Sequence, residues 1–365
     1  MPETVYAAGE DIGTMWIQTA RDDGKGGITY NSTRDAYCEM PHDDEMESVL
    51  KEQGIHFIKE GQKIYVLGED AYRQCSMAEF TLKADDDILK RPMKSGVINP
   101  SSPKTAVTIL RELMRACLER GVGQARPGEI LYFSVPANPV DSPIDSTFHE
   151  SMAKQFLQGL GYDARPLGEG AAVIYAENPL MHLPDGTTVP LTGLGVSLGA
   201  GQQNFCLAQR GKAIDEFSVA RSGDWIDDRV AVVTGEPKTK VLRMKENKLD
   251  FNNLDLDDPI ILALDSYYEA LVKYSFGKFA ERFANKRGSL DGSIDMVLSG
   301  GTASVPGFDK KVKAVLSNMD LPFKIHEVRL AGGGDRMKML KAVVKGCYVR
   351  AVQAAKKANA ESEKK

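Results

Sequence analysis

The sequence predicts an α/β protein that is built from two similar domains. Strand-like and helix-like segments alternate along the chain, and a short hairpin with a Gly-centred turn occurs twice, at Gly9–Ala20 and Gly195–Ala208. The chain has 365 residues, of which 42% are apolar, and this exceeds the length at which one hydrophobic core normally keeps growing. We therefore expect two cores, each associated with one copy of the hairpin.

The first half is expected to alternate strands and helices around an inserted subdomain. Three strands form a meander at the start, and the Gly-rich stretch RDDGKGG provides the turn between the second and the third. Apolar residues at helical spacing from Val107 to Cys117 predict a long helix. The expected elements are strands at about 5–8, 15–20, 27–31 and 130–135, helices at about 107–117, 146–160 and 168–177, and an irregular insertion with a hairpin at 55–71.

The second half repeats this plan after 177–193, a segment rich in Pro, Gly and Thr. A hairpin at 196–210 opens it, and apolar residues from Ile260 to Tyr274 share one face of a long helix. A strand at 294–298 and a helix at 337–357 follow. The predicted domains are 1–185 together with 336–365, with an insertion at about 36–98, and 186–335, with an insertion at about 222–290.

Composition excludes several classes of protein. Lys and Arg number 46 against 51 Asp and Glu, and no extended basic tract occurs, so nucleic acid is not an expected partner. The five cysteines are scattered and lack CxxC spacing, which argues against a disulfide framework or a zinc site. The start lacks the features of a signal peptide, and no apolar run approaches a membrane span. We expect a cytoplasmic protein without an intrinsic membrane segment.

The repeated hairpin has a direct chemical interpretation. A Gly turn lets backbone N–H groups approach an anion, and two such turns that face each other could hold the phosphates of a nucleotide from both sides. Asp11 precedes the first turn, where its carboxylate could hold the water shell of a phosphate-bound Mg²⁺.

Five landmarks resemble the ATPase superfamily that contains actin, heat-shock chaperones and sugar kinases. The two hairpins resemble its phosphate-one and phosphate-two loops, and VLSGGTASVPGF (297–308) resembles its adenosine loop. LGEGAAVIYAENP (167–179) is similar to its first connecting helix, and LRMKENK (242–248) to a helix that contacts the nucleoside. Within the superfamily, KRPMKSGVINPSS (90–102) and SGDWIDD (222–228) resemble segments of the bacterial actins of the MreB and MamK types.

The resemblance implies an actin-like ATPase fold, with two ribonuclease H-like domains around a nucleotide cleft and a subdomain inserted into each. It implies that Glu169 positions the attacking water and that Asp11 holds Mg²⁺ through water. The residues implied to contact ATP or ADP are Gly13, Thr14, Met15, Gly199, Ala200, Gly201, Gln202, Lys245, Glu246, Gly300, Gly301 and Thr302.

The implied function is that of a bacterial actin, which polymerises head to tail into cytoskeletal filaments with ATP and Mg²⁺. Its partners would be further copies of itself and cytoplasmic cargo or adaptor proteins. Ser197 departs from the family, whose members carry an acid there, and losing a positioning carboxylate costs on the order of 10²–10⁴ in rate. A slow ATPase is therefore expected. Two alternatives stay open: a non-hydrolysing actin-like adaptor or scaffold, and a small-molecule kinase of the same superfamily.

Overall fold

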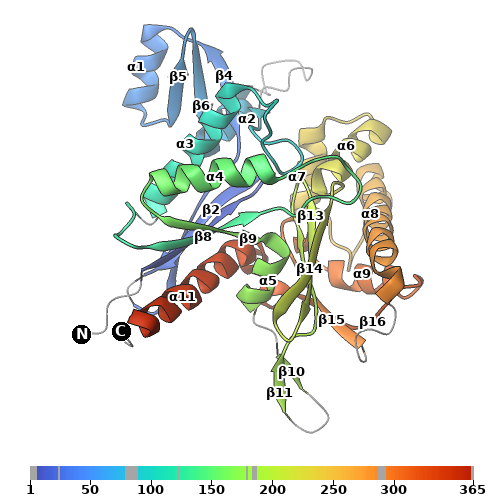
Figure 1. Ribbon diagram of the computed structural model, residues 1–365. Coiled ribbons are helices and arrows are strands. Elements are labelled where there is room, and N and C mark those ends of the chain that lie inside the picture. The colour runs from blue at the N-terminus through green and yellow to red at the C-terminus, as the bar shows by residue number, and fades with distance from the viewer. Residues whose placement is uncertain are drawn as a thin grey trace.

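Two five-stranded sheets form the framework of the molecule (Figure 1). The computed structural model describes residues 6–23, 25–78, 89–121, 123–177, 180–182, 187–286 and 293–362. The first sheet contains, in spatial order, β3 (Ile28–Arg34), β2 (Trp16–Asp22), β1 (Ala7–Ile12), β8 (Ile130–Val135) and β9 (Asp163–Gly168). The second contains β14 (Lys212–Val219), β13 (Gln203–Gln209), β12 (Gly193–Leu198), β15 (Ser293–Ser299) and β16 (Lys324–Leu330).

The two sheets have the same topology. In each, the first three strands of the half form an antiparallel meander, and two further strands add in parallel beside the first. Both predicted hairpins are confirmed, with Gly9 opposite Ala20 in the first and Gly195 opposite Cys206 in the second. The α/β prediction is therefore confirmed, and the hairpins occupy corresponding places in the two sheets.

Helices cover both faces of each sheet. The first sheet is contacted by α3 (Lys104–Gly121), α4 (Thr147–Gly159) and α11 (Ala342–Ser362). On the second sheet, α5 (Glu169–Glu177) packs against β12 and β13, while α8 (Pro259–Phe283) places Phe276 against Phe205 of β13. The helices α5 and α11 meet between the two halves (Figure 1). Gly346 permits this contact, because a Cβ there would lie 1.9 Å from the carbonyl oxygen of Ala172.

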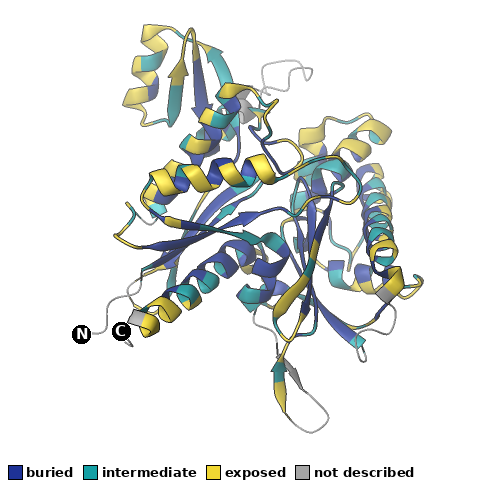
Figure 2. Ribbon diagram, in the orientation of Figure 1, coloured by how far each residue is buried: buried dark blue, intermediate teal, exposed yellow. Residues whose placement is uncertain are grey.

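The central strands of both sheets are the most deeply buried elements (Figure 2). Every residue of β8 and of β12 is buried, which explains why both read as continuous apolar runs rather than as alternating patterns. The outer faces of α4 and α11 carry exposed residues (Figure 2). The Gly-centred turn that follows β12 is consequently held on a rigid support.

A small four-stranded sheet with its own core is inserted into the first half. Its strands lie in the order β5 (Phe57–Glu60), β6 (Lys63–Leu67), β4 (Tyr37–Pro41) and β7 (Leu89–Lys90). The predicted hairpin is present as β5 and β6. The helices α1 (Asp44–Glu52) and α2 (Gly68–Ala78) were not predicted, although Asp43 caps α1 by accepting a hydrogen bond from the backbone N–H of Met46 at 2.8 Å.

The corresponding part of the second half is helical. It contains α6 (Gly223–Thr234), α7 (Lys238–Asn247) and the long helix α8. Asp258 caps α8 and Pro259 occupies its first turn, where a missing N–H costs nothing. The remaining helical elements are the 3₁₀ turns Ala284–Lys286, Thr302–Ser304 and Ala331–Gly334 and the α-helices α9 (Phe308–Leu316) and α10 (Arg336–Leu340).

The structure corrects several of the expected elements. The strands β9, β14 and β16 were not predicted, and the presumed boundary segment contains a short hairpin of β10 (Leu180–His182) and β11 (Thr188–Pro190). The expected helix at 337–357 is divided at Lys341 into α10 and α11. The bounds of the two domains stay a prediction. Parts of the predicted segments lie outside the described residues, namely 1–5, 24, 79–88, 122, 178–179, 183–186, 287–292 and 363–365.

Within the described ranges, no helix combines the length and the apolar character that a membrane crossing requires.

Candidate functional site

A cavity of about 800 Å³ lies between the two halves, and every residue predicted for the site lines it. The first half contributes the turn after β1, and the second contributes the turn after β12. Residues of α7 and the bend after β15 line the cavity as well. Its volume lies in the range that suits a ligand of nucleotide size.

The two turns have the same hydrogen-bonding pattern. The backbone N–H of Gly13 donates to the carbonyl of Trp16 at 3.0 Å, and that of Gly199 donates to the carbonyl of Gln202 at 3.1 Å. The turns also lie against each other, because a Cβ on Gly201 would be 2.7 Å from Oγ1 of Thr14. The repeated hairpins of the sequence therefore meet at one point.

Asp11 lies at the end of β1 and is held by a neighbouring strand. Oγ of Ser134 on β8 donates a hydrogen bond to Oδ1 of Asp11 at 2.7 Å and accepts one from the backbone N–H of Ile12 at 2.9 Å. Burial raises the pKa of Asp11 to about 6, although the hydrogen bond from Ser134 opposes this shift. Asp11 is thus a carboxyl group with a fixed orientation whose charge depends on pH near neutrality.

Glu169 is the first residue of α5 and lines the same cavity as Asp11. Oγ of Ser197 on β12 donates a hydrogen bond to its Oε2 at 2.9 Å. Burial, and then the negative charge of Asp11, raise the pKa of Glu169 to about 8. Within the described part of the chain, neither Asp11 nor Glu169 has an ion-pair partner. A carboxyl group such as that of Asp11, which lacks a compensating cation, is suited to the water shell of Mg²⁺.

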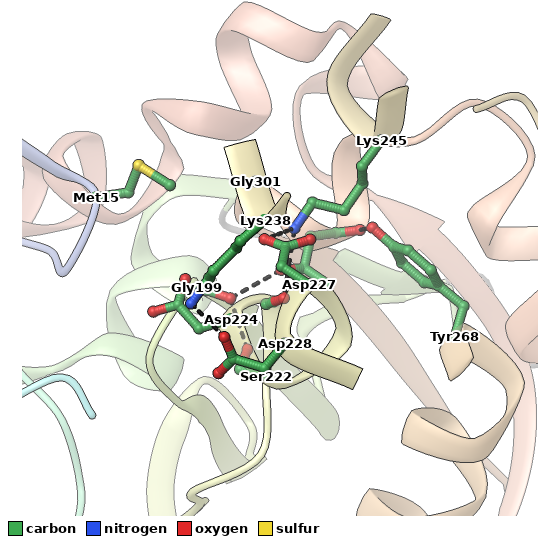
Figure 3. A network of polar contacts seen from close by, with 12 residues as sticks. Met15, Gly199, Ser222, Asp224, Asp227, Asp228, Lys238, Lys245, Tyr268 and Gly301 are labelled. Carbon is green, nitrogen blue, oxygen red and sulfur yellow. Dashed lines mark hydrogen bonds and ion pairs between the residues drawn. The ribbon is translucent and has the colours of Figure 1, made fainter. Parts of the chain in front are cut away.

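The carbonyl group of Gly199 in the second turn accepts hydrogen bonds from neighbouring parts of the pocket (Figure 3). The oxygen of Gly199 accepts hydrogen bonds from Oγ of Ser222 at 2.5 Å and from Oγ1 of Thr302 at 2.8 Å. The backbone N–H of Gly223 also donates to it, at 3.2 Å. These bonds fix the first turn of α6 and the bend after β15 beside the turn.

The bend after β15 requires glycine. Gly300 has a φ of 97°, and a Cβ there would lie 2.3 Å from the carbonyl oxygen of Leu198. The bend can therefore approach the second turn closely, and Thr302 is 4% exposed at its base. The OH group of Tyr268 on α8 donates to the carbonyl of Thr302 at 3.2 Å, which supports the bend from behind (Figure 3).

Lys245 on α7 is part of a buried ion pair (Figure 3). Its Nζ lies 2.7 Å from Oδ2 of Asp227 and 3.4 Å from the carbonyl of Gly223, and the two charged side chains are 9% and 2% exposed. Glu246 lines the cavity, and its carbonyl accepts a hydrogen bond from Nη1 of Arg336 at 2.9 Å. The structure brings both residues to the cavity, while their contact with a nucleoside stays a prediction.

Sequence reasoning did not identify several residues of the site. Ser134 supports Asp11, Asp224 lines the cavity from the first turn of α6, and Arg34 and Arg336 provide positive charge at its wall. Ser222 and Asp224 belong to the SGDWIDD stretch, which signalled only the start of an insertion. The arginines carried no local pattern that could have identified them.

Comparisons with known proteins agree with this architecture. The family model described as Volactin matches residues 6–351. No curated protein sequence matches the chain.

Solved structures cover nearly the whole chain at low sequence identity. A structure of a MamK double helical filament is 16% identical with a TM-score of 0.62, covering 95% of this chain and 98% of that chain. MreB5 of Spiroplasma citri bound to AMPPNP is 13% identical with a TM-score of 0.61, covering 99% and 100%. The ethanolamine utilization protein EutJ from Carboxydothermus hydrogenoformans is 14% identical with a TM-score of 0.53, covering 96% and 91%.

These three proteins are members of the actin-like ATPase superfamily, and likeness at this level of identity concerns the fold. The actin-like fold implied by the sequence is therefore confirmed. With a family model that spans residues 6–351 and two sheets of identical topology around a shared cavity, the chain belongs to the Volactin family and has the actin-like ATPase fold.

Proposed function

We propose that this protein binds ATP with Mg²⁺ in the cavity between its halves, hydrolyses it slowly and assembles head to tail into filaments. The observation that carries the proposal is the pair of opposed turns, Gly13–Met15 and Gly199–Gln202, which share one hydrogen-bonding pattern and lie in contact. Backbone N–H groups on two facing turns provide donors for a chain of phosphates. MreB5, which has the same fold, is bound to AMPPNP in one structure and to ADP in another.

The acidic end of the cavity suits the metal and the attacking water. Asp11 would hold the water shell of Mg²⁺, because Mg²⁺ prefers oxygen ligands and retains several waters. Glu169 would orient the water that attacks the terminal phosphate, and its deprotonated form is required for that role. The adenosine would lie toward Gly300–Thr302, with Lys245 and Glu246 on the facing helix.

Ser197 supports slow hydrolysis. A serine at this position donates a hydrogen bond to Glu169 but brings no negative charge to the metal. The same observation favours a second candidate function, that of an adaptor that binds nucleotide without turning it over. The two candidates differ only in the release of phosphate.

Self-assembly is inferred from the fold and from one relative. A MamK with this fold forms a double helical filament, and a contact between unlike surfaces that does not close on itself produces an open polymer. Sedimentation with and without ATP and Mg²⁺, together with phosphate release, tests the whole proposal. We expect nucleotide-dependent pelleting with slow release, whereas pelleting without release would indicate the adaptor. Folded protein that neither pellets nor releases phosphate would contradict both.

A further inference from the structure

One segment of the first half contacts the second half beside the cavity, and the proposed function gives it no role. It comprises residues 91–97, which we call the strap, and it follows β7 as the chain returns from the small inserted sheet. The strap contacts the second half at α6 and at the second turn. It therefore spans the same gap as the cavity.

Arg91 makes the first of these contacts. Its Nη1 donates to both carboxylate oxygens of Asp224, each at 2.9 Å, and the two side chains are 23% and 24% exposed. Nη2 of Arg91 also donates to Sδ of Met15 in the first turn at 3.4 Å. Asp224 in turn donates its backbone N–H to the carbonyl of Ala200 in the second turn at 2.9 Å. Arg91 and Asp224 thus connect the two opposed turns.

The second contact is made by the backbone of the strap. Nε2 of Gln202 donates to the carbonyl of Ser95 at 2.6 Å, and Oε1 of Gln202 accepts from Oγ of Ser218 at 2.7 Å. The Ser95 carbonyl is held in a tight turn, in which Lys94 and Val97 exchange both backbone hydrogen bonds at 3.0 and 3.1 Å. This turn presents its carbonyl to the second half in a fixed direction.

The space between strap and turn is too small for any side chain. A Cβ on Gly201 would lie 2.5 Å from the backbone nitrogen of Gly96. The two halves are therefore in backbone contact at this end of the cavity.

The charges around Arg91 favour the ion pair. Burial lowers the pKa of Arg91, but the negative charges of Asp224 and Asp35 raise it, and the pKa lies above its ordinary value. A partly buried pair in which one donor reaches both carboxylate oxygens contributes more than an exposed pair, whose contribution is screened by water.

We propose that Arg91 is a positioning residue of this pocket. By pairing with Asp224, it holds the two opposed turns at their closed spacing. This spacing sets the rate at which a bound nucleotide leaves. The inference rests on the proposed function for its ligand, whereas the closure that it describes is a property of the chain itself. Breaking the pair should affect the departure of nucleotide more than its arrival, because the pair holds the turns closed around a nucleotide that is already bound.

The first test measures the release of a fluorescent ATP analogue with Mg²⁺ by stopped-flow displacement. Arg91→Gln and Asp224→Asn should each raise the release rate about tenfold or more, which corresponds to at least about 1.4 kcal/mol. The double variant should release no faster than the faster single variant, because both substitutions break one interaction. Arg91→Lys should restore part of the slow release. Arg165→Gln breaks an exposed pair with Asp163 and serves as the matched control, expected at the wild-type rate.

The second test requires no nucleotide. Hydrogen exchange of the backbone amides at 199–203 and 223–226 should be faster in Arg91→Gln than in the wild type, while the melting temperature shows that the variant is folded. If the wild type binds nucleotide but release and exchange are both unchanged in the variants, the positioning role is wrong. If the wild type binds no nucleotide and exchange still rises when the pair is broken, the closure stands and the proposed function is wrong.

Discussion

Oγ of Ser197 donates a hydrogen bond to Oε2 of Glu169 at 2.9 Å, and both residues line the cavity. Ser197 occupies the position at which the resemblance predicts an acid. It is therefore hydrogen-bonded to Glu169, the residue proposed to orient water. A hydrogen bond to the charged carboxylate favours that form, so Ser197 lowers the pKa of Glu169 against the larger effect of burial.

Hydrolysis should depend on pH through Glu169. Because the pKa of Glu169 is about 8 in the metal-free protein and the carboxylate is the active form, kcat/KM for phosphate release should rise with pH, and Mg²⁺ beside Asp11 should place the midpoint below pH 8. The measurement is steady-state phosphate release at saturating Mg²⁺ from pH 6 upward. A rate that is independent of pH, or one that falls as pH rises, would contradict the assignment of Glu169.

Removing the hydroxyl group at position 197 should shift that profile. In Ser197→Ala the charged form of Glu169 loses one hydrogen bond, so its pKa should rise and the midpoint of the profile should move to higher pH. Ser197→Thr keeps the donor and is the matched control, with the midpoint of the wild type. If the alanine variant has an unchanged midpoint, Ser197 does not position Glu169.

Gly201→Ala should weaken nucleotide binding by about tenfold or more, because the new Cβ would lie 2.5 Å from backbone of the strap and 2.7 Å from Oγ1 of Thr14. The two turns could then not close to their present spacing. Calorimetric titration with ATP and Mg²⁺ measures the effect. Gly277→Ala on α8 is the control, since a Cβ there meets no atom within 4 Å and should leave binding unchanged. Equal affinities in both variants would mean that the contact between the turns is not needed for binding.

Glu10 on β1 should reduce the stability of the protein at neutral and alkaline pH. Its side chain is 0% exposed, and neither carboxylate oxygen has a hydrogen-bond partner among the described residues. Burial, and then the charge of Asp11, raise its pKa well above 4.5. The unfolded chain loses this proton near pH 4.5 and the folded chain retains it, so stability is greatest at acidic pH and falls as pH rises through this window.

Glu10→Met should therefore raise the free energy of unfolding at pH 8 by about 1–3 kcal/mol, and the gain should be smaller at pH 5. Urea unfolding at the two pH values measures the difference. Glu52→Met, at an exposed site on α1, is the control and should show no such dependence on pH. A destabilised variant, or an equal effect at both pH values, would show that Glu10 has a partner that offsets its burial.

The features that the sequence predicted best are local ones. Gly13 and Gly199 lie in turns between two short runs that can pair as a hairpin, and this pattern depends on only a few consecutive residues. The repetition of the pattern placed the turns in corresponding positions of the two halves. The residues of both turns, the Gly300 bend and Glu169 accordingly all line the cavity.

The features that the sequence missed depend on tertiary contacts. Ser134 is one polar residue within the buried strand β8, and nothing near it shows that it supports Asp11. Arg91 and Asp224 are 133 positions apart and meet only because the halves close. The strand β9 includes Pro166 and lies at the edge of its sheet. Its residue pattern alone does not indicate a strand, because Pro weakens the sequence signal of a strand.

Isothermal titration calorimetry on the purified chain shows whether the opposed turns bind a nucleotide with Mg²⁺. We expect saturable binding of one nucleotide per chain in the presence of Mg²⁺, and weaker binding to Gly201→Ala. Folded protein that binds neither adenine nor guanine nucleotides with Mg²⁺ present would contradict it.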